Sequence, residues 1–281
     1  MVIKKIISKI TARKIQVSIG VLWLINGLLQ LQPKMMTSSF AAKVIAPASN
    51  GQPIFISDPM HFAASLILGH PAFFDICFGL IQLTIGSMII FKKTAKTGLV
   101  ASIIWGIGVW YFGEGAGGIF SGHALLLTGA PGAALLYALI SLGVIGSSKR
   151  PAEWLKYVWV ALWVGSGLLL LWSRDTPVML SHMVYKMVYG APRWMATVDH
   201  ATASWLAAKA SWQILLFVLV YFAVGLSALI RSSWRYLGIA GGIIIALFIW
   251  IVGQGLGSYY TGLATDLNTA PLLILLAISI F

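Results

Sequence analysis

The stretch Gly113-Glu114-Gly115-Ala116-Gly117 recurs in the second half of the chain as Gly253-Gln254-Gly255-Leu256-Gly257. Adding 140 to the residue number, without a gap, pairs further identical residues in the two halves: Trp23 with Trp163, Gly27-Leu28-Leu29 with Gly167-Leu168-Leu169, Gly98 with Gly238, Trp110 with Trp250, Gly122 with Gly262, and Ala130-Pro131 with Ala270-Pro271. One register held over this length indicates an internal duplication. It predicts two units, residues 1–148 with a basic N-terminal segment and residues 149–281. The two units differ at Glu114, because Gln254 occupies the equivalent position in the second unit.

The composition is typical of a protein that resides in a lipid bilayer. Hydrophobic residues make up 59% of the 281-residue chain, and charged residues make up 9%. This is more apolar surface than a water-soluble core of this size hides. The 12 tryptophans and 9 tyrosines suit anchoring at the membrane interface. Because Cys77 is the single cysteine, an intramolecular disulfide is excluded.

Hydropathy predicts an all-α integral membrane protein. Eight segments approach the roughly 20 residues that cross about 30 Å of hydrocarbon. They are residues 16–32, 72–91, 98–119, 129–146, 156–173, 211–230, 236–257 and 268–281. Four spans in each unit return the chain to the same side, so we expect two parallel four-helix repeats related by a pseudo-two-fold axis along the membrane normal.

Basic residues predict the orientation. Most of the 19 lysines and arginines fall on one expected face: Lys4, Lys5, Lys9, Arg13, Lys14, Lys92, Lys93, Lys96, Lys149, Arg150, Lys156, Arg231 and Arg235. The positive-inside rule makes this face cytoplasmic, so we expect both termini on the cytoplasmic side of a prokaryotic plasma membrane. Topology and anionic lipid then account for the net charge of +12, and nucleic acid is not an expected partner.

Two long connections, residues 33–71 and 174–210, lie on the opposite, extracytoplasmic face. Loops of this length seldom lack structure. Residues 59–68, 178–187 and about 194–209 have the pattern of short amphipathic helices lying in the membrane plane. We expect these interfacial helices to cover the outer mouth of the bundle.

Glu114 is the first candidate catalytic residue. It lies at the outer end of the third expected span, and an acid at membrane depth is a functional hypothesis by default because its burial is costly. Trp110, four residues earlier, is expected on the same helical face. Gly113, Gly115 and Gly117 would let a helix or a flat ligand approach the backbone. The alternative is plain helix packing, with Glu114 reaching up to the interface.

His123 and Asp75 are the other candidate catalytic residues. His123 lies in the short connection that returns the chain from the third to the fourth span, so we expect it near Glu114. Asp75 is the second acid inside an expected span, just after His70-Pro71. The alternative for Asp75 is a near-surface cap at the start of the helix.

No metal site is the leading expectation, but a copper alternative exists. Its residues share one face of a helix and offer thioether and imidazole ligands that suit Cu(I): Met179, His182, Met183 and Met187. A methionine stripe is otherwise the apolar face of an interfacial helix. The sequence shows no zinc signature, no phosphate-binding loop, and no serine hydrolase pattern.

Residues 16–34, QVSIGVLWLINGLLQLQPK, resemble the opening of the DoxX/DoxD group of four-span membrane proteins. The resemblance rests on an apolar first helix with Gly27 in its middle, a polar end, and the layout of spans. It implies a tandem fusion of two such units, and a membrane subunit of the thiosulfate:quinone oxidoreductase type. The second unit departs from the first by having Leu170 in place of Gln30.

These observations lead to a functional hypothesis, a membrane subunit of quinone-linked electron transfer with its site near the extracytoplasmic face. Glu114 would accept or relay the proton, Trp110 would pack against the quinone ring, and His123 would be a second proton partner. A partner subunit would supply electrons, and a homo-oligomer is the other expected assembly. The alternatives are a small-solute or metal carrier and a non-catalytic scaffold of a larger complex.

Overall fold

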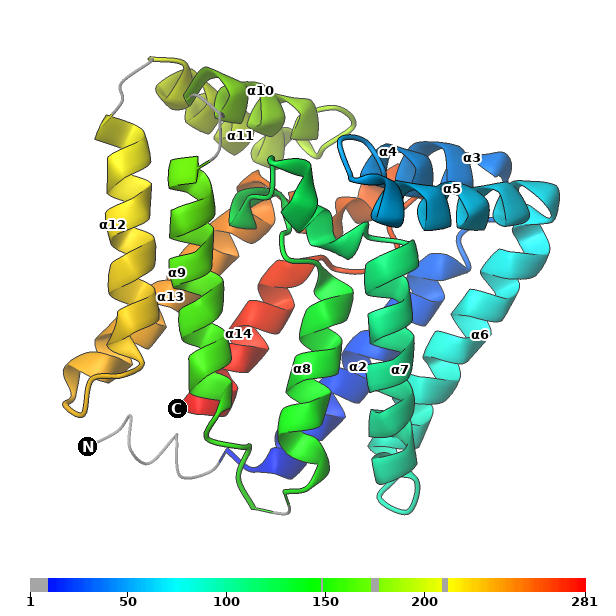
Figure 1. Ribbon diagram of the computed structural model, residues 1–281, viewed down its shortest axis with the longest axis horizontal. Helices are drawn as coiled ribbons and strands as arrows, with labels where there is room; N and C mark the ends of the chain where they lie inside the picture. Colours follow the sequence, from blue (N-terminus) through cyan, green and yellow to red (C-terminus); the bar gives the residue numbers. More distant parts are fainter. Residues whose placement is uncertain (1–9, 148, 173–176, 209–211) are drawn as a thin grey trace.

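The computed structural model describes residues 10–147, 149–172, 177–208 and 212–281, and within these ranges the regular structure is helical, without strands. Long helices run between the two ends of the molecule (Figure 1): α2 (Ala12–Gln30), α6 (Pro71–Ile90), α7 (Ala95–Phe112), α8 (Ala133–Ile145), α9 (Leu155–Trp172), α12 (Trp212–Ser227), α13 (Trp234–Val252) and α14 (Thr269–Ile280). Each overlaps one of the segments expected from hydropathy. The all-α class is therefore confirmed.

Among the described residues, four helices are long and apolar enough to cross a membrane: α6, α7, α9, and α13 counted together with the 3₁₀ segment that ends at Thr261. The number rises to five if α11 and α12, which are bent by 116° at the break between them, form one span. Helices α8 and α14 are apolar but shorter. These lengths and compositions are those of a multi-pass membrane protein, while eight spans in two parallel repeats stay a prediction.

Short helices cover one end of the bundle, which we call the capped end (Figure 1). They are α3 (Ser38–Phe40), the π-helical η1 (Ala41–Ile45), α4 (Ala46–Ala48), α5 (Ile54–Gly69), α10 (Pro177–Met187) and α11 (Arg193–Ala207). The helices predicted within residues 59–68, 178–187 and 194–209 are thus present. The start of α2, the C-terminus and the connections α6–α7, α8–α9 and α12–α13 lie at the other end, the basic end (Figure 1). The basic residues before position 10 lie outside the described residues.

Glycines set the spacing of the helix pairs. A Cβ at Gly27 of α2 would lie 2.9 Å from the Gly79 oxygen of α6, and one at Gly86 would lie 2.6 Å from the Gly20 oxygen. Backbones approach this closely only where no side chain intervenes. The interior toward the basic end is then filled by a continuous cluster that includes the fully buried Trp159.

Two of the expected spans end earlier than predicted. Helix α7 ends at Phe112 and α13 at Val252, so residues 98–119 and 236–257 are not continuous helices. Left-handed backbone is the physical reason, since it breaks a right-handed helix. The positions with positive φ pair up between the two halves in the register of the duplication: Gly115 and Gly255, Ala116 and Leu256, Gly117 and Gly257, Gly118 and Ser258, and Gly122 and Gly262. The 3₁₀ segments η2 (Ala116–Ser121) and η4 (Gly255–Thr261) follow these breaks.

Replacing Gly117 with Ala should destabilise the protein far more than replacing Gly122 with Ala. Both glycines are left-handed, which costs an alanine about 1–2 kcal/mol. At Gly122 the new Cβ meets no atom within 4 Å, but at Gly117 it would lie 1.7 Å from the Pro131 oxygen. Thermal unfolding in detergent, followed by circular dichroism, measures the difference. Equal melting temperatures would contradict the backbone contact.

Candidate functional site

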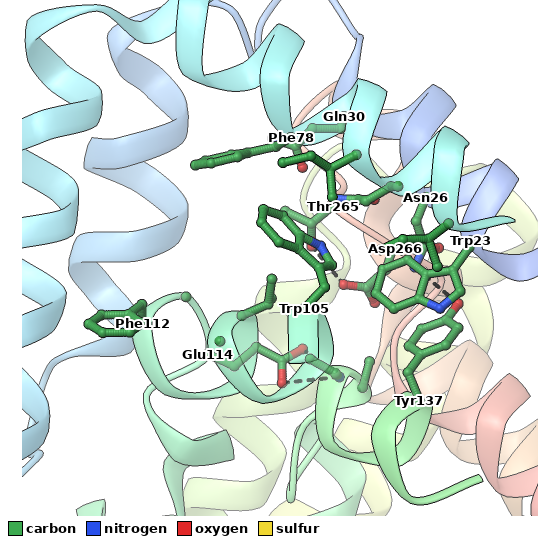
Figure 2. A pocket seen from close by; sticks show the side chains of 18 of the residues that line it. Trp23, Asn26, Gln30, Phe78, Trp105, Phe112, Glu114, Tyr137, Thr265 and Asp266 are labelled. Carbon is green, nitrogen blue, oxygen red and sulfur yellow. Dashed lines mark hydrogen bonds between the residues drawn. The ribbon is translucent and has the colours of Figure 1, made fainter. Parts of the chain in front are cut away.

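A cavity of about 910 Å³ lies in the first half of the chain, among α2, α6, α7 and α8 (Figure 2). Several of its lining residues are also exposed on the outer surface of the bundle, Leu80 of α6 by 55% and Ile104 of α7 by 68%. Phe112, at the end of α7, is exposed as well. Since exposed apolar side chains of two neighbouring helices line it, the cavity opens sideways between α6 and α7.

Polar side chains gather at the inner end of this cavity (Figure 2). Asn26 and Gln30 come from α2, and Tyr137 comes from α8. Glu114 follows α7, and Asp266 lies in the connection before α14. The cavity therefore joins an apolar mouth to an end that holds two carboxyl groups.

Glu114 is held by the start of α8. The Ala134 N–H donates to its Oε1 at 3.1 Å and to its Oε2 at 3.3 Å. Gly132 makes room for this contact, because a Cβ there would lie 2.2 Å from Glu114 Oε2. Burial raises the pKa of Glu114 from 4.5 to about 8, and the negative charge of Asp266 adds to the rise, while the Ala134 hydrogen bond opposes it. The carboxyl group is thus placed to carry a proton near neutral pH.

Gln254 holds the corresponding place in the second half without a charge. Its Oε1 accepts from the Ala270 N–H at 3.0 Å near the start of α14, and its Nε2 donates to Thr269 Oγ1 at 2.7 Å and to the Leu126 oxygen at 3.1 Å. Both residues therefore satisfy a helix N-terminus. Capping is common to the two halves, whereas ionisation is possible only at Glu114.

Asp266 is a site residue that sequence reasoning missed. Its carboxyl group accepts from the Thr265 hydroxyl at 2.8 Å and from the Asn268 N–H at 2.5 Å. Burial raises its pKa above 3.8. The equivalent position in the first half is Leu126, so a comparison of the two halves could have marked Asp266 as a polar difference. Its place beside Glu114 comes only from the tertiary fold.

Three buried polar atoms of the cavity lining have no hydrogen-bond partner: Asn26 Oδ1, Gln82 Oε1 and Trp105 Nε1. Native proteins leave few such atoms unsatisfied. The Asn26 side chain is otherwise ordered, because its Nδ2 donates to the Tyr137 hydroxyl at 3.0 Å. All three atoms are buried behind the cavity surface, so a ligand could bond to them only if these side chains turned.

Asp75 lies behind the cavity wall. It is fully buried in α6, and Gln30, which lines the cavity, donates to its Oδ1. Its Oδ2 has no partner. The alternative of a near-surface helix cap is therefore wrong, because the side chain faces α2 instead of the start of its own helix. Asp75 reaches the cavity only through Gln30.

A second cavity of about 430 Å³ lies between the two glycine-rich segments, at the capped end. His123 lines it and is exposed. Gly113 lines both cavities, and Gly117 lines the second one. Gly115 instead gives room to the chain around α4, since a Cβ there would lie 2.6 Å from the Ala48 oxygen.

Trp110 is not among the described residues that line either cavity. Its indole N–H donates to the Pro131 oxygen at 2.7 Å, and its side chain packs against the core cluster that contains Met60. Although α7 ends before Glu114, Trp110 and Glu114 lie on the same side, because a Cβ at Gly132 would lie 3.0 Å from Trp110 Cδ1 and 2.2 Å from Glu114 Oε2. Other aromatic side chains line the first cavity: Trp23, Phe40, Phe78, Trp105, Phe112 and Tyr137.

The residues of the copper alternative lie on α10. Met179 and His182 are exposed, while Met183 packs against the core cluster formed with Val184. The Met187 oxygen accepts from the Tyr260 hydroxyl at 3.1 Å. Within the described part of the chain, no group of three or more His, Cys, Asp or Glu residues could hold a metal ion.

Comparisons with models of protein families, with curated proteins and with solved structures found no significant match to this chain. The resemblance of residues 16–34 to the DoxX/DoxD group therefore stays a prediction. In the structure this segment belongs mainly to α2, where Gly27 packs against α6 and Gln30 reaches Asp75. The segment thus forms one wall of the first cavity.

Replacing Gln30 with Leu, the residue of the second half, should destabilise the protein by about 1–3 kcal/mol, because Asp75 would lose its partner while remaining buried. The double variant Gln30→Leu/Asp75→Leu removes both polar groups and should recover most of this loss. Thermal unfolding in detergent measures both. A double variant no more stable than Gln30→Leu would show that the pair does not act as a unit.

Proposed function

We propose that this chain is an eight-span membrane protein of two parallel four-helix repeats whose first cavity binds a quinone, as the membrane subunit of a quinone-linked oxidoreductase of the DoxX/DoxD type. The observation that carries the proposal is the cavity itself, with a mouth between α6 and α7 and two carboxyl groups at its inner end. A ligand that arrives through lipid and exchanges protons suits such a cavity.

The size and lining of the cavity support this ligand class. Its volume of about 910 Å³ lies in the range of small-molecule sites. If these side chains turned toward the cavity, the Trp105 indole could donate to a quinone carbonyl, and Gln82 or Asn26 could accept from a quinol hydroxyl, which are the partners these buried atoms lack. The apolar tail of the ligand would leave past Leu80 and Ile104.

The chemistry needs protons and electrons from different sources. Reduction of a quinone to a quinol takes up two electrons and two protons. Glu114 and Asp266 can hold protons at the inner end of the cavity. Because a single cysteine cannot ligate an iron–sulfur cluster, we assign the electrons to a redox group of a partner subunit.

The second half of the chain lacks the residues of this site. Ser166, Leu170 and Gln254 occupy the positions of Asn26, Gln30 and Glu114. The rings of Trp163 and Tyr221, centred 5.4 Å apart, belong to the hydrophobic core of the second half. One site per chain, in the first half, follows from this difference.

In the proposed orientation the basic end is cytoplasmic, as the positive-inside rule requires. The capped end and both carboxyl groups then lie toward the extracytoplasmic side of a prokaryotic plasma membrane. Helices α5, α10 and α11 would lie in the interface above the site.

Purified protein in lipid nanodiscs should bind a short-chain quinone analogue, and Gly108→Leu should weaken this binding tenfold or more. Gly108 lines the cavity, and a Cβ there meets no atom within 4 Å, so leucine fills ligand space without displacing protein. Gly241→Leu in α13 is the matched control, because its Cβ position is equally open and lies outside both cavities. Titration calorimetry measures the affinities.

The alternatives give different results in the same experiment. A non-catalytic scaffold binds no quinone analogue in any variant, and that result would refute the proposal. A carrier moves solute across proteoliposome membranes without a partner subunit. Equal loss of binding in Gly108→Leu and Gly241→Leu would place the ligand outside the first cavity.

Quinone affinity should fall as the pH rises through about 8. Only the protonated carboxyl group of Glu114 donates a hydrogen bond, and because its pKa is raised to about 8, Glu114 stays protonated at lower pH and loses its proton above it. In Glu114→Gln the amide donates at every pH, so the decline assigned to Glu114 should disappear. The variant should fold, since Gln254 makes the equivalent cap. An unchanged pH profile in Glu114→Gln would remove Glu114 from the site.

A further inference from the structure

The first and second cavities meet at the two acidic side chains. Glu114 and Asp266 line both cavities, together with Thr265 and Gly113. One cavity opens toward lipid between α6 and α7, and the other lies between the glycine-rich segments at the capped end. The carboxyl pair therefore forms the boundary between a lipid-side space and a space at the opposite, polar side.

The second cavity has a lining that suits water. Much of its lining is glycine backbone. Polar side chains line it as well: His123, Thr128, Ser258, Thr265 and Asn268. Water occupies a cavity only where it is roomy and offers polar partners, and a volume of about 430 Å³ with these groups meets both conditions. The exposed side chain of His123 places this cavity next to the molecular surface.

We propose that the second cavity is a water-filled proton passage from the capped face, and that Asp266 exchanges protons between this passage and Glu114. This inference rests on the proposed quinone function and deepens it, because it assigns the route by which the protons of that reaction reach the ligand. It also gives Asp266 a role that depends on the second half of the chain.

Each acid that gives up a proton in the passage receives one back in the same cycle. When the reduced quinone takes a proton from the Glu114 carboxyl, Glu114 becomes a carboxylate. The Asp266 carboxyl then gives its proton to Glu114, and a hydronium ion in the second cavity restores Asp266 and leaves water. Two such cycles supply the two protons of one quinol, while the partner subunit supplies the two electrons.

The groups that face the pair favour a shared proton. Tyr137 of α8 and His123 of the connecting loop are the other titratable groups of the two linings, and neither lining contains a lysine or arginine within the described residues. With no fixed positive charge in either lining, two adjacent carboxylates repel each other. The charge on Asp266 accordingly raises the pKa of Glu114.

Thiol labelling tests whether water reaches the second cavity. In a Cys77→Ala background, Ala264→Cys places a thiol on the lining at a buried position, and a charged, membrane-impermeant reagent that enters the cavity should modify it in nanodiscs. Asn50→Cys, at the exposed capped end, is the reactive control, and Leu168→Cys, on the exposed apolar face of α9, is the unreactive one. Labelling of Ala264→Cys as slow as that of Leu168→Cys would overturn the passage.

Infrared pH titration tests the coupling of the two acids. The carboxyl bands of the wild-type protein should contain two coupled steps that are lost in Asp266→Asn and in Glu114→Gln. In Asp266→Asn the Glu114 step should move to lower pH, because a neighbouring negative charge is gone, while the asparagine keeps an acceptor for the Asn268 N–H. If Glu114 titrates identically with Asp and with Asn at position 266, the pair does not exchange protons and the inference fails.

The two proposals can fail separately. Labelled Ala264→Cys and coupled acids in a protein that binds no quinone analogue would refute the quinone function alone. Quinone binding that Gly108→Leu abolishes, in a protein with an unlabelled second cavity or uncoupled acids, would refute the passage alone.

Discussion

The left-handed backbone after α7 is the constraint on which the site depends. It stops the helix at Phe112 and turns the chain so that Glu114 meets the N-terminus of α8. Gly117 then lies against the Pro131 carbonyl at a distance that no side chain would permit. Without this turn, Glu114 would continue along α7, and neither cavity would have its acidic boundary. The glycines act by allowing backbone contact, and through that contact they position a carboxyl group.

The two halves use one backbone device for different purposes. Positive φ angles recur at equivalent positions of the halves, and the N–H groups of Glu114 and Gln254 both bond to the carbonyl five residues earlier, at Val109 and Ile249. In the second half the amide of Gln254 completes a neutral network with Thr269 and Leu126. A neutral cap stabilises a helix start and needs no proton. Glu114 caps a helix in the first half with the same backbone geometry, and it can also gain or lose a proton.

The sequence predicted the helices better than their ends. Long apolar stretches identify a membrane helix because crossing hydrocarbon requires about 20 residues, and helices occur in all the segments so identified. The same length rule extended the third segment to residue 119, although Gly115 and Gly117 favour a left-handed break. Trp110 and Glu114 still lie on one side, since both side chains contact the position of Gly132. The eight spans and the parallel repeat stay predictions, since four to five helices have the length and composition to cross.

Asp266 shows a different limit, because no local pattern connects a loop acid in one half to a cavity in the other. It also has a consequence for how the chain can be divided. Residues of the first half line most of the first cavity, but one of its two acids comes from the connection before α14. The first half expressed alone would therefore be an incomplete unit, short of one acid that only its sister sequence provides.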